Sequence, residues 1–251
     1  MAGASAERQE NGVIQKIKSA VKANAKNPIT LKAGKTIIEG VIDAEKYTGR
    51  QLGGSEPYTD VVIYVLQKGK KVPINCSLKG ESAPSLAGGG LKGLELAVPG
   101  IAKKFMEAAY KELRTGKKLK AGDKVPDVFG KISPANKVKI VVGNVKMGGP
   151  IDYMYIGPMS VSGNYDKKKN LLPLNGELTE AETYAKTHNL YFRLRARRED
   201  QRFDPDAKDK DGTPKIYGVS PSRGDSAGRI VVTDKVPSTG VIVNIWNSHN
   251  S

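Results

Sequence analysis

Apolar residues recur along the chain with two different periods, and the period indicates which segments form helices and which form strands. In residues 13–21 the apolar positions lie three or four residues apart, with the lysines mostly off that stripe. This spacing predicts an amphipathic helix that ends at Asn27-Pro28. Residues 1–11 are polar and lack the stripe, so we expect a flexible tail there.

The strongest strand signals belong to a predicted hairpin. Residues 59–66 are apolar on both faces, as is typical of a central strand, and residues 72–79 alternate between apolar and polar. The polar run 67–71 between them turns the chain, so the two strands should pair. A shorter strand is expected just before them, at 36–42.

After the hairpin, the spacing of apolar residues predicts first helix and then strand. A glycine-rich loop at 88–90 leads into helical sequence that continues to about Arg114 and is broken at Pro99. Residues 138–145 and 154–156 then predict two more strands.

These elements predict an α/β (α+β) fold with three regions. Residues 1–11 form the tail. Residues 12–157 form a core in which a mixed sheet is flanked by helices. Residues 158–251 form a smaller, mostly β extension with one helix near 179–187. A chain of 251 residues is long enough for such a core.

The charge of the chain is strongly positive. There are 41 Lys and Arg against 26 Asp and Glu, a formal net charge of +15. Such an excess attracts polyanions and favours contact with phosphates, although a solubilising surface would show the same balance.

Other counts exclude several classes of protein. Cys76 is the only cysteine and there are two histidines, which excludes an intramolecular disulfide and the usual structural zinc site. No run of about 18 apolar residues predicts a membrane span, and the N-terminus has no signal-peptide core. We therefore expect a cytoplasmic protein, or one packaged in a virion.

Two polar residues should share one end of the predicted hairpin. If Gly69-Lys70 are the turn residues, Asp60 lies directly opposite Lys79, and opposed residues point to the same face. A slip of two residues keeps that face, whereas a slip of one destroys it. A plain surface ion pair, contributing about 0–1 kcal/mol, is the alternative explanation.

Asp60, a strand, a turn and then Ser77-Leu78-Lys79 resemble the motif of the PD-(D/E)XK, or restriction-endonuclease-like, nucleases. The order helix, strand, hairpin, helix, strand over residues 12–157 is also similar. The resemblance implies hydrolysis of phosphodiester bonds. In this family the Asp and a second carboxylate hold one or two Mg²⁺ ions, and the Lys helps to activate the attacking water.

The sequence departs from that motif at two positions. Thr59-Asp60 replaces Pro-Asp, and Ser77 replaces the second carboxylate. Some members carry Ser there and supply the acid from the next helix, as Glu95 would, while Glu81 is a second possibility. The candidate catalytic residues are Asp60, Ser77, Lys79 and Glu95, and the candidate Mg²⁺ ligands are Asp60, Glu39, Glu81 and Glu95. Whether the site is active stays open.

Two basic segments are candidates for contact with phosphates. Arginines alternate with apolar residues over 190–197, which predicts a strand with one buried face and one basic face. A charged edge strand is the alternative. Lysines also crowd the end of the long helix, where they partly complement its dipole. The candidate nucleic-acid-binding residues are Tyr191, Arg193, Arg195, Arg197, Arg198, Lys117, Lys118 and Lys120.

The first hypothesis is therefore a Mg²⁺-dependent, nuclease-like DNA-binding protein. The alternative is a non-catalytic structural or virion-assembly protein that uses the same fold and contacts packaged nucleic acid. SLKGESAPSLAGGGLKGLE is similar to nuclease-like proteins of large DNA viruses and phages, which adds viral capsid proteins as candidate partners. A second copy of the chain is another candidate partner, and no membrane is expected. An RNA binder ranks last, because only 6% of the residues are aromatic.

Overall fold

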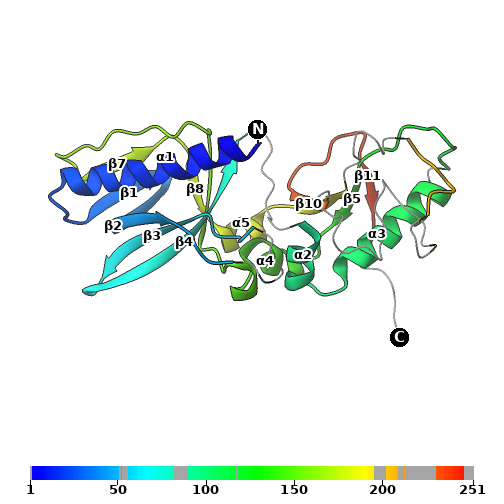
Figure 1. Cartoon of the computed structure of the whole chain (residues 1–251), viewed down its shortest axis with the longest axis horizontal. Coiled ribbons are helices and arrows are strands. Elements are labelled where there is room, and N and C mark those ends of the chain that lie inside the picture. Colours follow the sequence, from blue (N-terminus) through cyan, green and yellow to red (C-terminus); the bar gives the residue numbers. More distant parts are fainter. Residues whose placement is uncertain are drawn as a thin grey trace. The chain divides into compact units, whose positions relative to one another are not determined.

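The chain folds as two compact units, each with its own sheet (Figure 1). The computed structural model describes residues 2–50, 52, 56–81, 90–116, 118–194, 202–208, 212 and 230–245. The first unit comprises 1–50, 57–84 and 142–184, and the second comprises 51–56, 85–141 and 185–251.

The first unit contains a seven-stranded mixed sheet. Its strands, in spatial order, are β7 (Leu171–Leu174), β1 (Ile29–Ala33), β2 (Thr36–Lys46), β3 (Val61–Gln67), β4 (Lys70–Gly80), β6 (Tyr153–Gly157) and β8 (Glu177–Glu180). Strands β1 to β4 pair antiparallel in succession. The pairs β1–β7 and β4–β6 are parallel, and β6–β8 is antiparallel. The expected mixed sheet with flanking helices is confirmed at this level.

Helix α1 (Ala2–Ala23) packs its apolar stripe against this sheet, alongside which it lies in Figure 1. Val13, Ile17 and Ala20 are buried in one cluster with residues of the strands. The predicted tail at 1–11 is wrong, because the helix begins at Ala2. The stripe continues toward the N-terminus through a polar residue, Gln9, which is only 2% exposed.

The first sheet curls because β2 bends. Gly40 has a φ of 74°, and the β2–β3 register shifts between Val41 and Asp43. Beyond the bend, the start of β2 reaches the far edge of the same sheet. There the Thr36 hydroxyl donates a hydrogen bond of 2.5 Å to the carbonyl oxygen of Leu178 in β8.

The second unit has a four-stranded sheet of β10 (Ile230–Thr233), β9 (Tyr191–Leu194), β5 (Val128–Lys131) and β11 (Val241–Val243), in that order. Its helices include α2 (Gly90–Ala97) and α3 (Ile101–Lys111), which runs into a π-helical turn, η1 (Glu112–Gly116). The break at Pro99 is as predicted. The rings of Phe105 and Phe192, 5.7 Å apart, pack α3 against the sheet.

Helices also lie near the points where the chain passes from one unit to the other. Helix α4 (Pro134–Val142) and the short 3₁₀ helix η2 (Val145–Met147) precede β6, and α5 (Ala181–Thr187) follows β8. In the part of the chain that the structure describes, no helix is both long and apolar enough to cross a bilayer.

The strand predicted at 138–145 is wrong, because most of that segment belongs to α4. The buried positions Lys137, Ile140 and Val141 have helical spacing. Ser133 stands directly before Pro134, and its carbonyl oxygen accepts the backbone N–H of Lys137. A Ser followed by Pro is typical of a helix start, and this signal outweighs the β propensity of the valines.

The division of the chain at residue 157 does not match the two units. Strands β7 and β8, which the sequence assigned to the extension, form the two edges of the first sheet. Conversely, residues 128–131 fall within the predicted core, but they form β5, which pairs with β9 more than 60 residues later. Each unit is thus assembled from separate segments, because strands far apart in the sequence pair with each other.

The bend at Gly40 generates a prediction. We expect Gly40→Ala to lower the free energy of unfolding by at least about 2 kcal/mol, measured by urea denaturation. A Cβ at this position would combine a positive φ with a contact of 3.0 Å to the carbonyl oxygen of Leu66. Gly69→Ala is the matched control, since Gly69 has a φ of 75° but nothing within 4 Å of the added Cβ. Equal losses for the two variants would contradict the role of the close contact.

Candidate functional site

The hairpin of β3 and β4 places the predicted site at one end of the first sheet. Gln67 pairs with Lys70 around the two-residue turn Lys68-Gly69, whose φ values of 49° and 75° are typical of a type I′ turn. The observed register is therefore two residues from the predicted one, and it puts Asp60 opposite Ser77. A slip of two preserves the face, so Asp60 and Lys79 still share it.

Alternation along β4 identifies which face this is. Cys76 and Leu78 belong to the core cluster that includes α1, so Ser77 and Lys79 point to the opposite face of the sheet. Ser77 is 2% exposed and Lys79 is half-buried. The site is thus a small polar group at the end of the hairpin that lies away from the turn.

The carboxylate of Asp60 is held by β4. Its Oδ2 accepts a hydrogen bond of 3.0 Å from the Ser77 hydroxyl and one of 2.6 Å from the backbone N–H of Leu78. The backbone N–H of Asp60 in turn donates to the carbonyl oxygen of Cys76. At the position where the resemblance expects a second carboxylate, a hydroxyl donates to the first one instead.

The segment that leads into Asp60 is fixed by its backbone. The N–H groups of Tyr58 and Thr59 donate to the carbonyl oxygens of Met147 and Gly148. Both side chains are buried, and among the described residues neither hydroxyl oxygen has a hydrogen-bond partner. Burial raises the pKa of Tyr58 above its ordinary value.

Helix α1 adds a second polar group at the same end of the sheet. The Gln9 side-chain amide donates to three carbonyl oxygens at the ends of β4 and β6, namely those of Lys79, Gly157 and Pro158. One residue further, Glu10 forms an ion pair of 2.8 Å with Lys46. Sequence analysis missed these residues because it treated 1–11 as a tail.

The surroundings of Lys46 show that negative charge gathers at this end. The hydrogen bond to Glu10 is the largest cause that raises the pKa of Lys46, with smaller contributions from the charges of Glu7 and Asp60. The sequence did contain a signal that extends the helix to Gln9 and Glu10, because Ala6, Gln9 and Val13 are spaced to lie on one helical face.

Of the remaining candidate metal ligands, the two in the first unit do not lie beside Asp60. Glu39 lies beyond the bend at Gly40, past the part of β2 that pairs with β3. Glu81 is exposed just after the end of β4. Glu95 belongs to the second unit, where its Oε2 accepts a hydrogen bond of 2.6 Å from the backbone N–H of Gly100 at the start of α3.

Within the first unit, the donor set at Asp60 therefore does not fit a Mg²⁺ site. Within the described ranges, no group of three or more His, Cys, Asp or Glu side chains could hold a metal ion. Every Asp and Glu of the first unit lies within those ranges. A hydroxyl and a backbone N–H donate to the carboxylate from one side, whereas Mg²⁺ prefers several oxygen ligands around it.

The predicted basic strand is β9, and its alternation is confirmed. Leu190, Phe192 and Leu194 are fully buried. However, β9 lies between β10 and β5, so the alternative of an edge strand is wrong. Of the basic face, Tyr191 and Arg193 are described, whereas Arg195, Arg197 and Arg198 lie outside the described residues.

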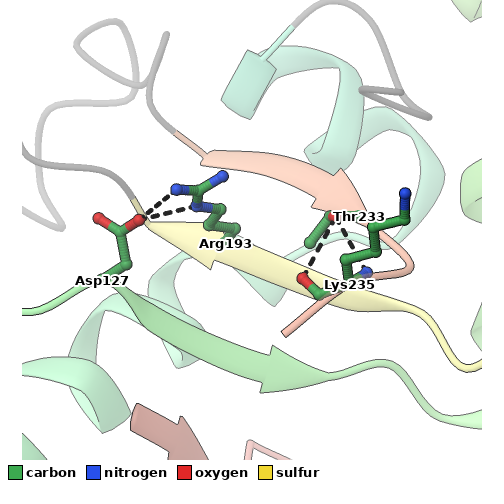
Figure 2. A network of polar contacts seen from close by, with 4 residues as sticks. All are labelled: Asp127, Arg193, Thr233 and Lys235. Atoms are coloured by element: carbon green, nitrogen blue, oxygen red, sulfur yellow. Dashed lines mark hydrogen bonds and ion pairs between the residues drawn. The ribbon is translucent and has the colours of Figure 1, made fainter. Parts of the chain in front are cut away.

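Arg193 already has a partner within the second unit (Figure 2). Its guanidinium contacts Oδ2 of Asp127 through Nε at 2.8 Å and a terminal nitrogen at 2.5 Å, and lies 5.8 Å from the centroid of the Phe129 ring. Nearby, Thr233 and Lys235 close a turn after β10, also drawn in Figure 2. Arg193 thus joins the start of β5 to β9.

The second basic cluster is only partly described. Lys118 and Lys120 are exposed, whereas Lys117 lies outside the described residues. The backbone N–H of Lys120 donates to Asp123, which fixes the turn. The two described lysines remain candidates for contact with phosphates.

One cavity of the second unit, of about 370 Å³, lies between the end of β5 and β11. Ile132, Pro134, Ile242 and Val243 supply its apolar lining, and no carboxylate, imidazole or thiol lines it. Lys131, Ser133 and Asn244 supply its polar lining.

Compared with protein-family models, with curated proteins and with solved structures, the chain matches none.

The contacts of Asp60 predict a structural role for its carboxylate. We expect Asp60→Ala to lower the free energy of unfolding by about 1–3 kcal/mol in urea denaturation, because the buried Ser77 hydroxyl and the Leu78 N–H lose their acceptor. Glu81→Ala serves as the control. It should change stability by less than about 0.5 kcal/mol, since Glu81 is exposed. Equal effects of the two substitutions would contradict this role.

The pairing of Arg193 predicts energetic coupling with Asp127. In a double-mutant cycle of Arg193→Ala and Asp127→Ala, we expect a coupling of about 1 kcal/mol that weakens as salt is added. The two side chains are 35% and 29% exposed, which limits the strength of the pair. Additive effects of the two substitutions on the free energy of unfolding would show that the pair does not stabilise the second unit.

Proposed function

We propose that this protein binds nucleic acid, DNA in preference to RNA, and that its first unit is a nuclease-like scaffold that does not cut. The observation that carries the proposal is the hydrogen bond from Ser77 to Asp60. Ser77 stands where the family resemblance expects a metal-binding carboxylate. Its hydroxyl stabilises Asp60 within the fold and adds no negative charge.

The order of elements supports the scaffold. In the first unit, α1 is followed by β2, by the β3–β4 hairpin and then by β6. Helices α2 and α3 lie between β4 and β6 in the sequence, and these two strands pair parallel. The implied order of helix, strand, hairpin, helix and strand can be traced through these elements, with β1 added after α1. The helices α2 and α3 belong to the second unit.

The distribution of charge supports a polyanionic partner. The second unit contains 24 Lys and Arg against 14 Asp and Glu, a net charge of +10. The first unit contains 17 against 12, a net charge of +5. Both units are therefore basic, so the attraction to phosphates is not confined to one of them.

A second candidate function is a metal-dependent endonuclease. The observation in its favour is that Asp60 and Lys79 share one face at one end of the hairpin, as the resemblance requires. It ranks second because the described carboxylates do not supply further ligands beside Asp60. Virion packaging and contact with capsid proteins stay predictions from the sequence.

The proposal predicts binding without cleavage. We expect purified protein to bind duplex DNA with an affinity that falls linearly on a log–log plot against salt. Supercoiled plasmid should stay intact with Mg²⁺, Mn²⁺ or EDTA. Binding is measured by fluorescence anisotropy and nicking by agarose gel, with Lys79→Ala as the comparison variant.

Two outcomes would contradict the proposal in different ways. Metal-dependent nicking that disappears in Lys79→Ala would establish the endonuclease instead. Failure of the wild-type protein to bind either DNA or RNA, even at low salt, would overturn both candidate functions.

A further inference from the structure

The outer half of the β3–β4 hairpin extends beyond its neighbouring strands. We call residues 66–74 the hairpin tip. On one side, the pairing of β3 with β2 ends at Val65, where β2 bends away. On the other side, the pairing of β4 with β6 begins only at Cys76. Apart from the approach of Gly40 to the backbone of Leu66, the tip is therefore a two-stranded antiparallel ribbon with no strand paired to it on either side.

The hairpin tip carries only positive charge. Lys68, Lys70 and Lys71 are all exposed, and Leu66 beside them is 43% exposed. No Asp or Glu occurs anywhere between Val61 and Gly80. Three ammonium groups thus lie within four residues and have no acid in the same hairpin.

The three lysines are spread around the ribbon. Lys71 is paired with Leu66 on one face, and Lys70 is paired with Gln67 on the other, because adjacent pairs of a ladder point to opposite faces. Lys68 occupies the turn itself. The ribbon therefore presents positive charge on both faces and at its end. This distribution suits a site with phosphates on two sides better than a single row of phosphates.

Contacts at the base of the hairpin tip hold it in place. The ammonium nitrogen of Lys71 lies 3.7 Å from the centroid of the Tyr64 ring, and the Tyr64 hydroxyl donates to Glu45 of β2. On the opposite face, Val72 and Ile74 pack against the core cluster. The lysines are thus presented on an ordered ribbon, which lowers the entropy lost when a partner binds.

We infer that the hairpin tip enters the major groove of duplex DNA and sets its lysines against the phosphates of both strands. A two-stranded β ribbon fits the major groove, which is about 12 Å wide. The two groove walls are phosphate backbones, which match the charge on both faces of the ribbon. The inference rests on the proposed nucleic-acid binding and adds a contact surface in the first unit.

The test compares two variants that lose the same charge. One is Lys68→Asn with Lys70→Gln and Lys71→Gln, which gives the turn an Asn-Gly sequence suited to type I′. The matched control is Lys167→Gln with Lys168→Gln and Lys169→Gln, three exposed lysines in another turn of the same unit. Binding to a short DNA duplex is measured by anisotropy from about 50 to 200 mM salt.

We expect the tip variant to make the negative slope of log K against log salt shallower by about 2.7, since each lost phosphate contact removes about 0.9 from its magnitude. The control should keep the wild-type slope. Wild-type protein should also protect guanine N7, which lies in the major groove, from methylation, and the tip variant should lose that protection. Thermal unfolding checks that both variants fold like the wild type.

The outcomes separate this inference from the proposed function. If both variants weaken binding equally, or if neither does, the hairpin tip has no special role and the inference is overturned, while DNA binding itself stands. Unchanged methylation of N7 in the wild-type complex would also overturn it, because the major groove would then be empty. If the wild type binds no DNA, the proposed function fails together with the inference.

Discussion

The arrangement of the first unit depends on one backbone bend. At Gly40, β2 leaves β3 and turns toward β8, so a single strand contributes to two differently oriented parts of the sheet. This bend lets the sheet curl, and it also ends the pairing of β3 with β2 on one side. The same bend thus shapes the core around α1 and leaves the β3–β4 hairpin projecting.

The exchange of a carboxylate for a hydroxyl changes the electrostatics of the site. Two carboxylates at the positions of Asp60 and Ser77 would repel each other unless a cation lay between them. With Ser77, the contact is attractive without a cation, because the hydroxyl donates to the carboxylate. This end of the hairpin can therefore be stable without a bound cation, and this is why we place binding ahead of cleavage.

Local patterns predicted much of the fold but little of its pairing. The hairpin, the alternation in β9 and the break at Pro99 follow from residues close together in the sequence. The predicted register of the hairpin differs from the observed one by two residues. The reason is that the turn uses Lys68 with a positive φ, which only a minority of lysines adopt. The partner of Arg193, Asp127, lies 66 residues away, and no local period reveals such a contact.

The interleaving of the two units also constrains the order in which the chain can fold as it is synthesised. Strand β5 leaves the ribosome long before β9 and β11, its neighbours in the second sheet. Meanwhile β4 must wait for β6, because residues 85–141 of the second unit lie between these two strands in the sequence. Neither sheet can be completed early, so the nascent chain carries unpaired strand edges through much of translation. The hairpin tip keeps unpaired edges even in the finished fold, and its exposed lysines oppose pairing of those edges with strands of other chains.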